Sequence, residues 1–124
     1  METHAAASAW VAAWSKGWAE HDSDAIAARY ADDCEFRSHP FREPLFGREG
    51  ARSYVEQAFA GERSAISAFG EPIVAADGRA AVEYRATITT TDGRTMTLFG
   101  VTVLRFDEDG LVQEHRDYWS TQPS

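Results

Sequence analysis

The sequence predicts an α+β domain in which helices come first and a β-sheet follows. The first half of the chain carries apolar side chains at the spacing of a helix. From Ser64 onward, segments rich in Val, Thr, Ile, Tyr and Phe are separated by three Asp-Gly pairs, and Asp-Gly is the strongest short signal for a β-hairpin. A chain of 124 residues suits one domain with its own core, so we expect a single domain over residues 1–124.

The first helix is predicted by its tryptophans. Trp10, Trp14 and Trp18 recur every four residues, which places them along one side of a helix. Such a stripe is most often core packing. The surrounding run is apolar, but no basic region precedes it and it is too short to cross a bilayer, so we expect neither a signal peptide nor a membrane span.

A short second helix and a first strand follow. Asp22 or Ser23 can cap the helix, and Ile26 and Tyr30 then face inward. Residues 31–40 have a composition typical of a strand, and this segment ends at a proline.

A third helix is expected after the segment "FREPLFG", whose proline and glycine are typical of a loop. Its apolar side chains have helical spacing. They are Ala51, Tyr54, Val55, Ala58 and Phe59.

The Asp-Gly pairs predict a four-stranded antiparallel meander and its register. A two-residue turn at 92–93 pairs Thr102 with Glu83, and the same kind of turn at 109–110 pairs Asp117 with Thr102. Because side chains alternate along a strand, one face is then defined. Its members are Glu83, Arg85, Thr87, Met96, Leu98, Gly100, Thr102, Leu104, His115, Asp117 and Trp119.

This face combines apolar walls with a few polar groups, as small-molecule sites do. Asp117 is the first candidate for a catalytic residue. Burial would raise the pKa of its carboxyl group and a nearby arginine would lower it, which suits a general base near neutral pH. Arg85 and Glu83 are expected beside it, although the same three residues would also make an ordinary surface ion cluster. His39 and His115 are further candidates, since an imidazole pKa of about 6.5 suits proton shuttling.

The opposite face would be too apolar to leave in water. It is expected to carry Val82, Tyr84, Phe99, Val101 and Val103. Soluble monomers avoid contiguous apolar patches of this kind, so the sequence predicts a homodimer through this outer face.

Composition narrows the partners. The net charge of −8 argues against nucleic acid and anionic membranes, which require basic surfaces. One cysteine, Cys34, excludes an intrachain disulfide and fits a reducing cytoplasm, where we place the protein. The sequence has no metal-ligand spacing and no glycine-rich phosphate loop, so we expect no metal and no cofactor.

Three stretches make the chain resemble the nuclear-transport-factor-2-like superfamily, in its SnoaL-like branch of polyketide cyclases and limonene epoxide hydrolases. They are "AARYADDCEF", "PLFGREGARSYVEQAF" and "LVQEHRDYWS", and the resemblance covers nearly the whole chain. The resemblance implies a cone, in which a curved antiparallel or mixed sheet and three N-terminal helices enclose a hydrophobic pocket. It also implies that the face bearing Asp117 is the pocket wall.

The resemblance also suggests site residues. The closing R-D-Y-W text of residues 116–119 matches the family's closing strand, whose aspartate is the base that activates water in the epoxide hydrolases. Phe36 and Ser38 stand where those enzymes hold that water with a tyrosine and an asparagine. The expected ligand-binding residues are Trp14, Trp18, Tyr30, Phe36, Ser38, Met96, Leu98 and Trp119.

Two functions remain open from the sequence. The first is a cofactor-free enzyme acting on a small hydrophobic molecule by acid–base chemistry, of a cyclase, isomerase or hydrolase type. The second is a non-catalytic ligand-binding or dimerisation module of the same fold. The changed residues at positions 36 and 38 favour the module, whereas a buried set of acid, arginine and acid favours the enzyme.

Overall fold

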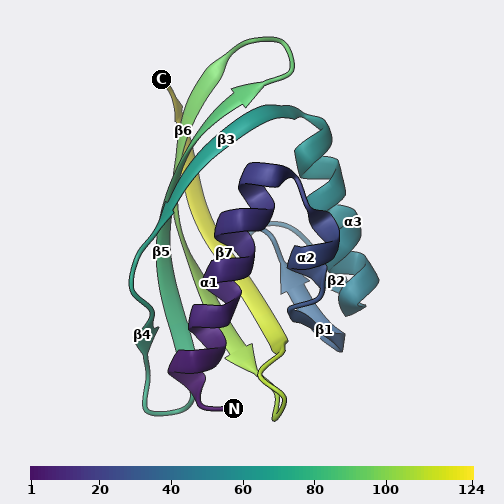
Figure 1. Ribbon diagram of the computed structural model, residues 1–124, viewed down its shortest axis with the longest axis vertical. Helices are drawn as coiled ribbons and strands as arrows, with labels where there is room; N and C mark the ends of the chain where they lie inside the picture. Colours follow the sequence, from purple (N-terminus) through teal and green to yellow (C-terminus); the bar gives the residue numbers. More distant parts are fainter.

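The computed structural model describes residues 1–124 as three helices and seven strands (Figure 1). In chain order these are α1 (Thr3–Glu20), α2 (Ser23–Ala27), β1 (Tyr30–Arg37), β2 (Leu45–Phe46), α3 (Gly47–Ala60), β3 (Glu62–Phe69), β4 (Ile73–Val74), β5 (Arg79–Thr90), β6 (Thr95–Phe106) and β7 (Val112–Pro123).

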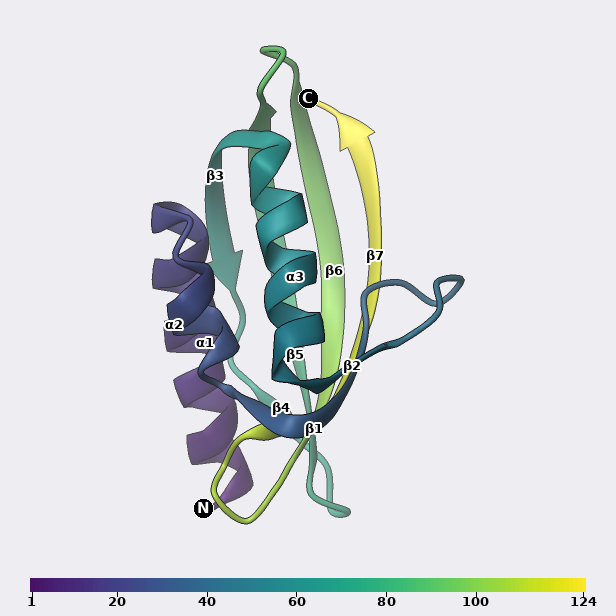
Figure 2. The ribbon, with the colours of Figure 1, turned by 90° about the vertical axis from the view of Figure 1, so that its right-hand side faces the viewer.

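The strands form one curved, mixed sheet in the order β2-β1-β7-β6-β5-β3, with β4 paired to β5. β1 runs parallel to β7, and the other pairs are antiparallel. The helices lie on one face of the sheet, and the long strands bend around α3 (Figure 2). The predicted α+β class, the three helices and the meander of β3, β5, β6 and β7 are therefore confirmed, and the sheet stays open at its edges.

The helices end where the sequence supplies caps. α1 ends at His21, which takes the left-handed conformation with φ 52°. The next residue, Asp22, caps α2 by accepting a hydrogen bond from the backbone N–H of Ala25 at 3.1 Å. This tight connection folds α2 back against α1.

The turn between β5 and β6 differs from the prediction by one residue. The N–H of Thr90 donates to the carbonyl of Arg94, the N–H of Gly93 donates to the carbonyl of Thr90, and Gly93 has φ 87°. The loop therefore has three residues, and Gly93 is its last member, the usual left-handed position before a bulge. Thr102 consequently pairs with Val82, and the predicted pairing with Glu83 is wrong.

This shift turns β5 over, because a slip of one residue moves every side chain to the other face. Val82 and Tyr84 are buried against the helices, contrary to their predicted place on the outer face. Glu83, Arg85 and Thr87 are exposed on the convex side. The predicted inner face is thus wrong for β5.

The register of β7 agrees with the prediction for a different reason. The turn before it is also a three-residue loop, with Gly110 at φ 79°. A bulge then shifts the pairing between Arg105 and Phe106. The two one-residue changes cancel, so Asp117 lies opposite Thr102 as predicted.

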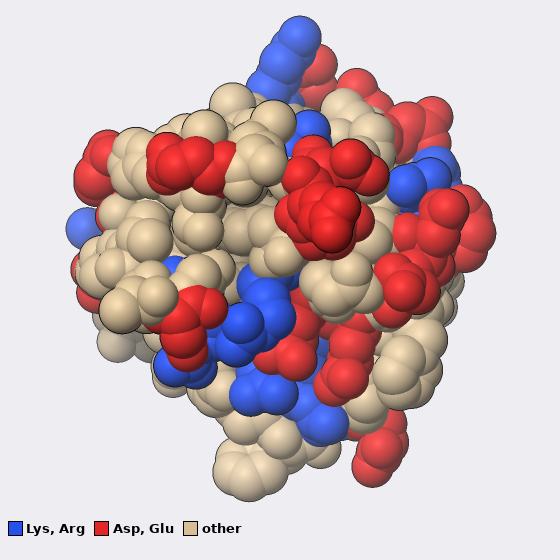
Figure 3. Space-filling view, turned by 90° about the horizontal axis from the view of Figure 1, so that it is seen from below, with Lys and Arg blue, Asp and Glu red and all other residues tan.

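The core fills the space between the helices and the concave face of the sheet. Its largest fully buried side chains include Trp10, Tyr30, Phe36 and Ile26, and the free thiol of Cys34 is buried with them. No helix is long and apolar enough to span a membrane. At the end of the molecule seen in Figure 3, a group of basic side chains lies among more widely spread acidic side chains.

Candidate functional site

A cavity of about 320 Å³ opens between the helices and the concave face of the sheet. Thirteen of its nineteen lining residues are hydrophobic, among them all four tryptophans of the chain, three from α1 and one from β7. The composition is that of a site for a small, mainly apolar molecule. Its polar lining residues are Arg42, Glu62, Thr102, His115, Asp117 and Thr121.

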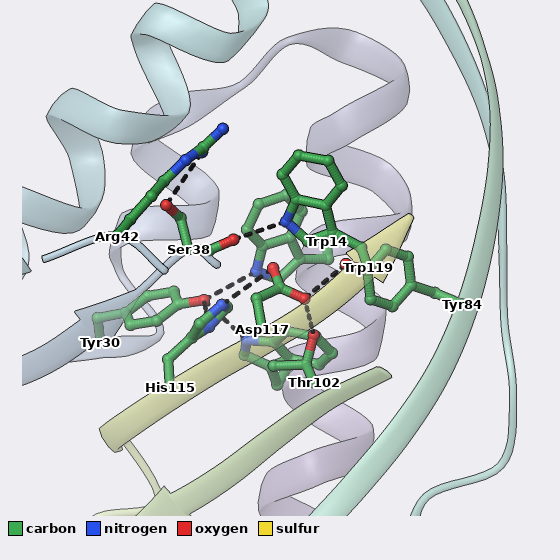
Figure 4. A network of polar contacts seen from close by, with 10 residues as sticks. Trp14, Tyr30, Ser38, Arg42, Tyr84, Thr102, His115, Asp117 and Trp119 are labelled. Atoms are coloured by element: carbon green, nitrogen blue, oxygen red, sulfur yellow. Dashed lines mark hydrogen bonds and ion pairs between the residues drawn. The ribbon is translucent and has the colours of Figure 1, made fainter. Parts of the chain in front are cut away.

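Asp117 on β7 is held in the cavity wall by three neighbours (Figure 4). Its Oδ1 accepts hydrogen bonds from the Tyr84 hydroxyl at 2.5 Å and from Thr102 Oγ1 at 3.1 Å. Its Oδ2 lies 3.3 Å from Nε2 of His115. The side chain is 15% exposed. The carboxylate is therefore fixed in orientation, and Oδ2 is the oxygen with fewer partners.

A chain of hydrogen bonds behind the wall fixes the tautomer of neutral His115. The Tyr30 hydroxyl accepts from the indole N–H groups of Trp10 and Trp14, both at 3.0 Å. Its own proton is therefore directed to His115 Nδ1 at 2.9 Å. With Nδ1 accepting, the ring proton of neutral His115 lies on Nε2 and points to Asp117.

The buried phenols around Asp117 act as hydrogen-bond donors. Burial raises the pKa of Tyr84 well above its usual range, and the charge of Asp117 and the hydrogen bond to it raise that pKa further. Burial likewise raises the pKa of Tyr30. Both hydroxyls consequently keep their protons at neutral pH, and Tyr84 donates to the carboxylate.

The edge of the cavity near β1 is built on Ser38. Its carbonyl accepts from the indole N–H of Trp119 at 2.6 Å, and its hydroxyl accepts from Arg42 at 3.2 Å. The Arg42 guanidinium lies over the Trp119 ring, 5.3 Å from its centroid. His39 packs edge-on against the same ring. The loop after β1 and the end of β7 are thereby joined beside the cavity.

A second acid, Glu62 at the start of β3, lines the cavity away from Asp117. Its carboxylate accepts from the indole N–H of Trp18, and His21 lies beside it. Burial raises the pKa of Glu62, and the hydrogen bond from Trp18 partly offsets this.

A known protein family matches most of the chain. The family model of the SnoaL-like domain matches residues 11–115. The chain belongs to the SnoaL-like family. This confirms the resemblance on which the sequence expectations rested.

Several solved structures share the SnoaL-like fold of this chain. The epoxide hydrolase/cyclase-like enzyme SalBIII, which functions in pyran ring formation in the polyether salinomycin, is 20% identical with a TM-score of 0.78, and 93% of each chain is covered. A type 2 hexachlorocyclohexane dehydrochlorinase (LinA) is 12% identical with a TM-score of 0.83, covering 97% of this chain and 87% of that one. A putative aromatic ring hydroxylase from Novosphingobium aromaticivorans is 17% identical with a TM-score of 0.82, covering 98% and 93%. At these identities the likeness shows the fold.

The structure brings together only part of the expected catalytic set. Asp117 and His115 line the cavity of this SnoaL-like domain, while His39 stands at its edge without lining it. Glu83 and Arg85 are on the convex face, where Arg85 covers the ring of Phe99 at 5.4 Å. Their predicted place beside Asp117 is wrong because of the three-residue turn before β6.

Most expected ligand-binding residues are in the lining. Trp14, Trp18, Met96, Leu98 and Trp119 face the cavity. Tyr30, Phe36 and Ser38 do not line it: Phe36 stacks on His115 with centroids 4.0 Å apart, and all three support the wall from behind.

Sequence reasoning missed Tyr84 and Glu62 as cavity residues. Tyr84 was assigned to the outer face through the turn, and a three-residue loop at Asp92-Gly93 would have placed it correctly. Glu62 lies at the junction of α3 and β3, where no periodic pattern assigns a face. No group of three His, Cys, Asp or Glu side chains is gathered that could hold a metal ion.

Gly100 is expected to be essential for the position of Tyr84. A Cβ at this site would lie 2.7 Å from the Tyr84 ring and hydroxyl and 2.9 Å from Cβ of Trp119. Gly100→Ala should therefore lower the free energy of unfolding by about 1–3 kcal/mol through overpacking. Denaturant unfolding measures this effect.

The matched control is Gly70→Ala, whose Cβ would meet only the Glu83 carbonyl at 3.5 Å and its Cβ at 3.8 Å. Its effect should stay within about 0.5 kcal/mol. Equal stability changes in the two variants would contradict the close packing of Tyr84 on Gly100.

Proposed function

We propose that this SnoaL-like protein is an acid–base enzyme for a small, uncharged hydrophobic molecule, with Asp117 as its general base. The observation that carries the proposal is the carboxylate of Asp117, held in a fixed orientation in the wall of a mainly apolar cavity. General-base catalysis requires a group held within hydrogen-bond reach of the proton that it removes. A cavity of this size and composition can hold a small apolar substrate beside Asp117.

Oδ2 of Asp117 is the oxygen that we assign to proton removal. Oδ1 already accepts from Tyr84 and Thr102, whereas Oδ2 has one contact of 3.3 Å with His115. An ionised carboxylate oxygen has two lone pairs, so Oδ2 retains one for a substrate or water proton. His115 orients the carboxylate by direct contact and Tyr30 acts on it through His115, so both are positioning residues in this scheme.

Three reaction types fit this geometry. Cyclisation, isomerisation and hydration each begin when a base removes a proton from a carbon, a hydroxyl group or a water molecule. The structural neighbours include an epoxide hydrolase/cyclase-like enzyme and a dehydrochlorinase. They support a catalytic use of the fold without selecting among these types for this chain.

One observation favours a second function, a non-catalytic ligand-binding module. Three donors of the protein already approach Asp117, which satisfies most of the acceptor capacity of its carboxylate. In a module the same network would only hold the cavity wall in shape. The two functions differ in whether the protein accelerates the loss of a proton from a bound neutral molecule.

The test is the ring opening of 5-nitrobenzisoxazole, a neutral aromatic compound that needs only a base. Removal of its C–H proton forms the nitrile as the N–O bond breaks, and the released phenolate is coloured. The wild-type protein should accelerate this reaction above a buffer of equal carboxylate concentration, with saturation. Wild type and Asp117→Asn reacting at the same rate would overturn the proposal and favour the binding module.

We also propose that a second copy of the chain covers the convex face and that the dimer works in the cytoplasm. The support for the dimer is the exposure of Ile66, Phe99 and Tyr118, which are 78%, 58% and 41% exposed on the surface. Tyr118 pairs directly with Val101 on the neighbouring strand. A buried, unpaired Cys34 suits a reducing compartment.

Val101→Glu is expected to convert the dimer into a monomer, since a charge would be buried in an apolar interface. Sedimentation at micromolar concentration measures the change. Phe41→Glu, which adds the same charge at a residue 93% exposed in the loop after β1, should leave the dimer intact. A wild-type protein that sediments as a 13.7 kDa monomer would contradict the proposed interface.

A further inference from the structure

Glu62 is the second carboxylate of the cavity, and the proposed proton transfer does not use it. It is the first residue of β3, and its backbone pairs with Thr90 near the end of β5. Asp117 pairs with Thr102 on β6, and Thr102 pairs with Val82, which lies toward the other end of β5. The Trp18 ring lies between the two acids, since it bonds to Glu62 and packs 6.3 Å from the Tyr84 ring.

Glu62 is almost withdrawn from solvent but is poorly supplied with donors. Its side chain is 10% exposed. One donor, the indole N–H of Trp18, is shared between its oxygens at 3.3 and 3.0 Å. Nε2 of His21 lies 3.3 Å from Oε2 but makes no hydrogen bond, and the imidazole stacks on Phe59 with centroids 4.5 Å apart.

The surroundings of Glu62 therefore leave acceptor positions open toward the cavity. A carboxylate can accept about four hydrogen bonds, and an unsatisfied buried polar group is costly. The cavity lining is mainly apolar, and the indole N–H of Trp18 is the side-chain group that donates a hydrogen bond to Glu62. Asp117, in contrast, is approached by three donors.

A hydroxyl group is the ligand group that fits this position best. Burial raises the pKa of Glu62, and a hydroxyl group can pair with either protonation state of its carboxyl group. A hydroxyl donates to the carboxylate and accepts from the carboxylic acid. An ether oxygen or a hydrocarbon cannot donate to either form.

We propose that Glu62 binds a hydroxyl group at one end of an elongated, otherwise apolar substrate. The assignment of the other end to the reacting group rests on the proposed function of Asp117. The substrate class is thus an apolar alcohol of about the length of the cavity. Trp18 and His21 position the carboxylate through their contacts with it.

Two matched pairs of compounds test this subsite. They are geraniol with geranyl methyl ether, and 2-(2-naphthyl)ethanol with its methyl ether. In each pair the alcohol should bind about two- to tenfold more tightly than the ether, the factor of one net hydrogen bond. Titration calorimetry measures both affinities.

Indole N–H resonances locate the hydroxyl group. Trp10 and Trp14 donate to Tyr30, Trp119 donates to Ser38, and Trp18 donates to Glu62. Titration with an alcohol should therefore shift the Trp18 signal more than titration with its ether does. Tryptophan-to-phenylalanine variants assign the four signals.

Substitutions at Glu62 provide the deciding comparison. Glu62→Met keeps the approximate size but cannot pair with a hydroxyl, so the alcohol and the ether should bind equally. Glu62→Gln can still donate and accept, so it should retain part of the preference. Circular dichroism and thermal unfolding verify that both variants are folded. A preference that persists in Glu62→Met, or the absence of saturable binding of every compound to the wild type, would overturn the inference.

Asp117→Asn separates this inference from the proposed function. If both are right, the variant loses the ring-opening activity yet still prefers the alcohol. Loss of the preference in Asp117→Asn but not in Glu62→Met would place the hydroxyl at Asp117 and overturn the Glu62 subsite alone. Retained ring-opening activity in Asp117→Asn, with a preference that depends on Glu62, would overturn the proposed base alone.

Discussion

Asp117→Asn is expected to slow base-dependent turnover by about 10²–10⁴-fold, the usual contribution of one general base. The amide has the shape of the carboxylate, and its oxygen can still accept from Tyr84 and Thr102 at the positions that Oδ1 occupies. It cannot take up a proton at neutral pH. Its NH2 group faces the Nε2 proton of His115, so that one contact is lost. The main loss should appear in the rate, while circular dichroism shows a retained fold.

Glu83→Gln is the matched control for Asp117→Asn. It also removes one carboxylate from the sheet, but on the convex face and away from the cavity. Its ring-opening rate should equal that of the wild type. A large loss in Glu83→Gln would contradict the observed register of β5, and no loss in Asp117→Asn would contradict the assigned base.

Trp10→Ala is expected to lower the free energy of unfolding by about 3–5 kcal/mol, as truncation of a buried large aromatic residue does. Trp10 is 2% exposed and meets Phe69 edge-on at 5.9 Å. Its indole also donates to Tyr30. The variant loses these contacts and leaves a void beside the cavity, which Trp10 lines.

Denaturant unfolding measures this loss, and two variants resolve its origin. Trp10→Phe keeps most of the packing and removes the hydrogen bond, so a smaller loss of about 0.5–1.5 kcal/mol is expected. Phe41→Ala truncates an aromatic residue that is 93% exposed and should change stability by less than about 0.5 kcal/mol. A Trp10→Ala variant as stable as Phe41→Ala would contradict the buried position of Trp10.

The sequence was sufficient for those features that depend on neighbouring residues. Side-chain period and capping residues predicted the helices, and Asp22 is the cap that the structure shows. The Asp-Gly pairs placed the turns, because glycine supplies the positive φ that a tight turn requires. The tryptophan spacing in α1 predicted the stripe that includes the cavity wall.

The sequence failed where one residue of loop geometry decides the outcome. Asp-Gly is compatible with loops of two and three residues, and the choice reverses which face of β5 meets the helices. Glu83 and Arg85 were therefore expected in the site, which Tyr84 occupies instead. The same uncertainty did not affect Asp117, because the bulge in the pairing of β6 with β7 offset the longer loop.

By itself, then, the sequence determined the order of the elements, the family, and a cavity-facing position for Asp117 and His115. The order of the elements follows from local periodicity, whereas the cavity-facing position of Asp117 and His115 rested on the family resemblance and on two changes of pairing that offset each other. The tertiary structure alone decided the donors around Asp117 and the entry of Glu62 into the cavity. Those contacts join residues that are distant in the chain, and their pairing depends on loop lengths, bulges and helix packing acting together.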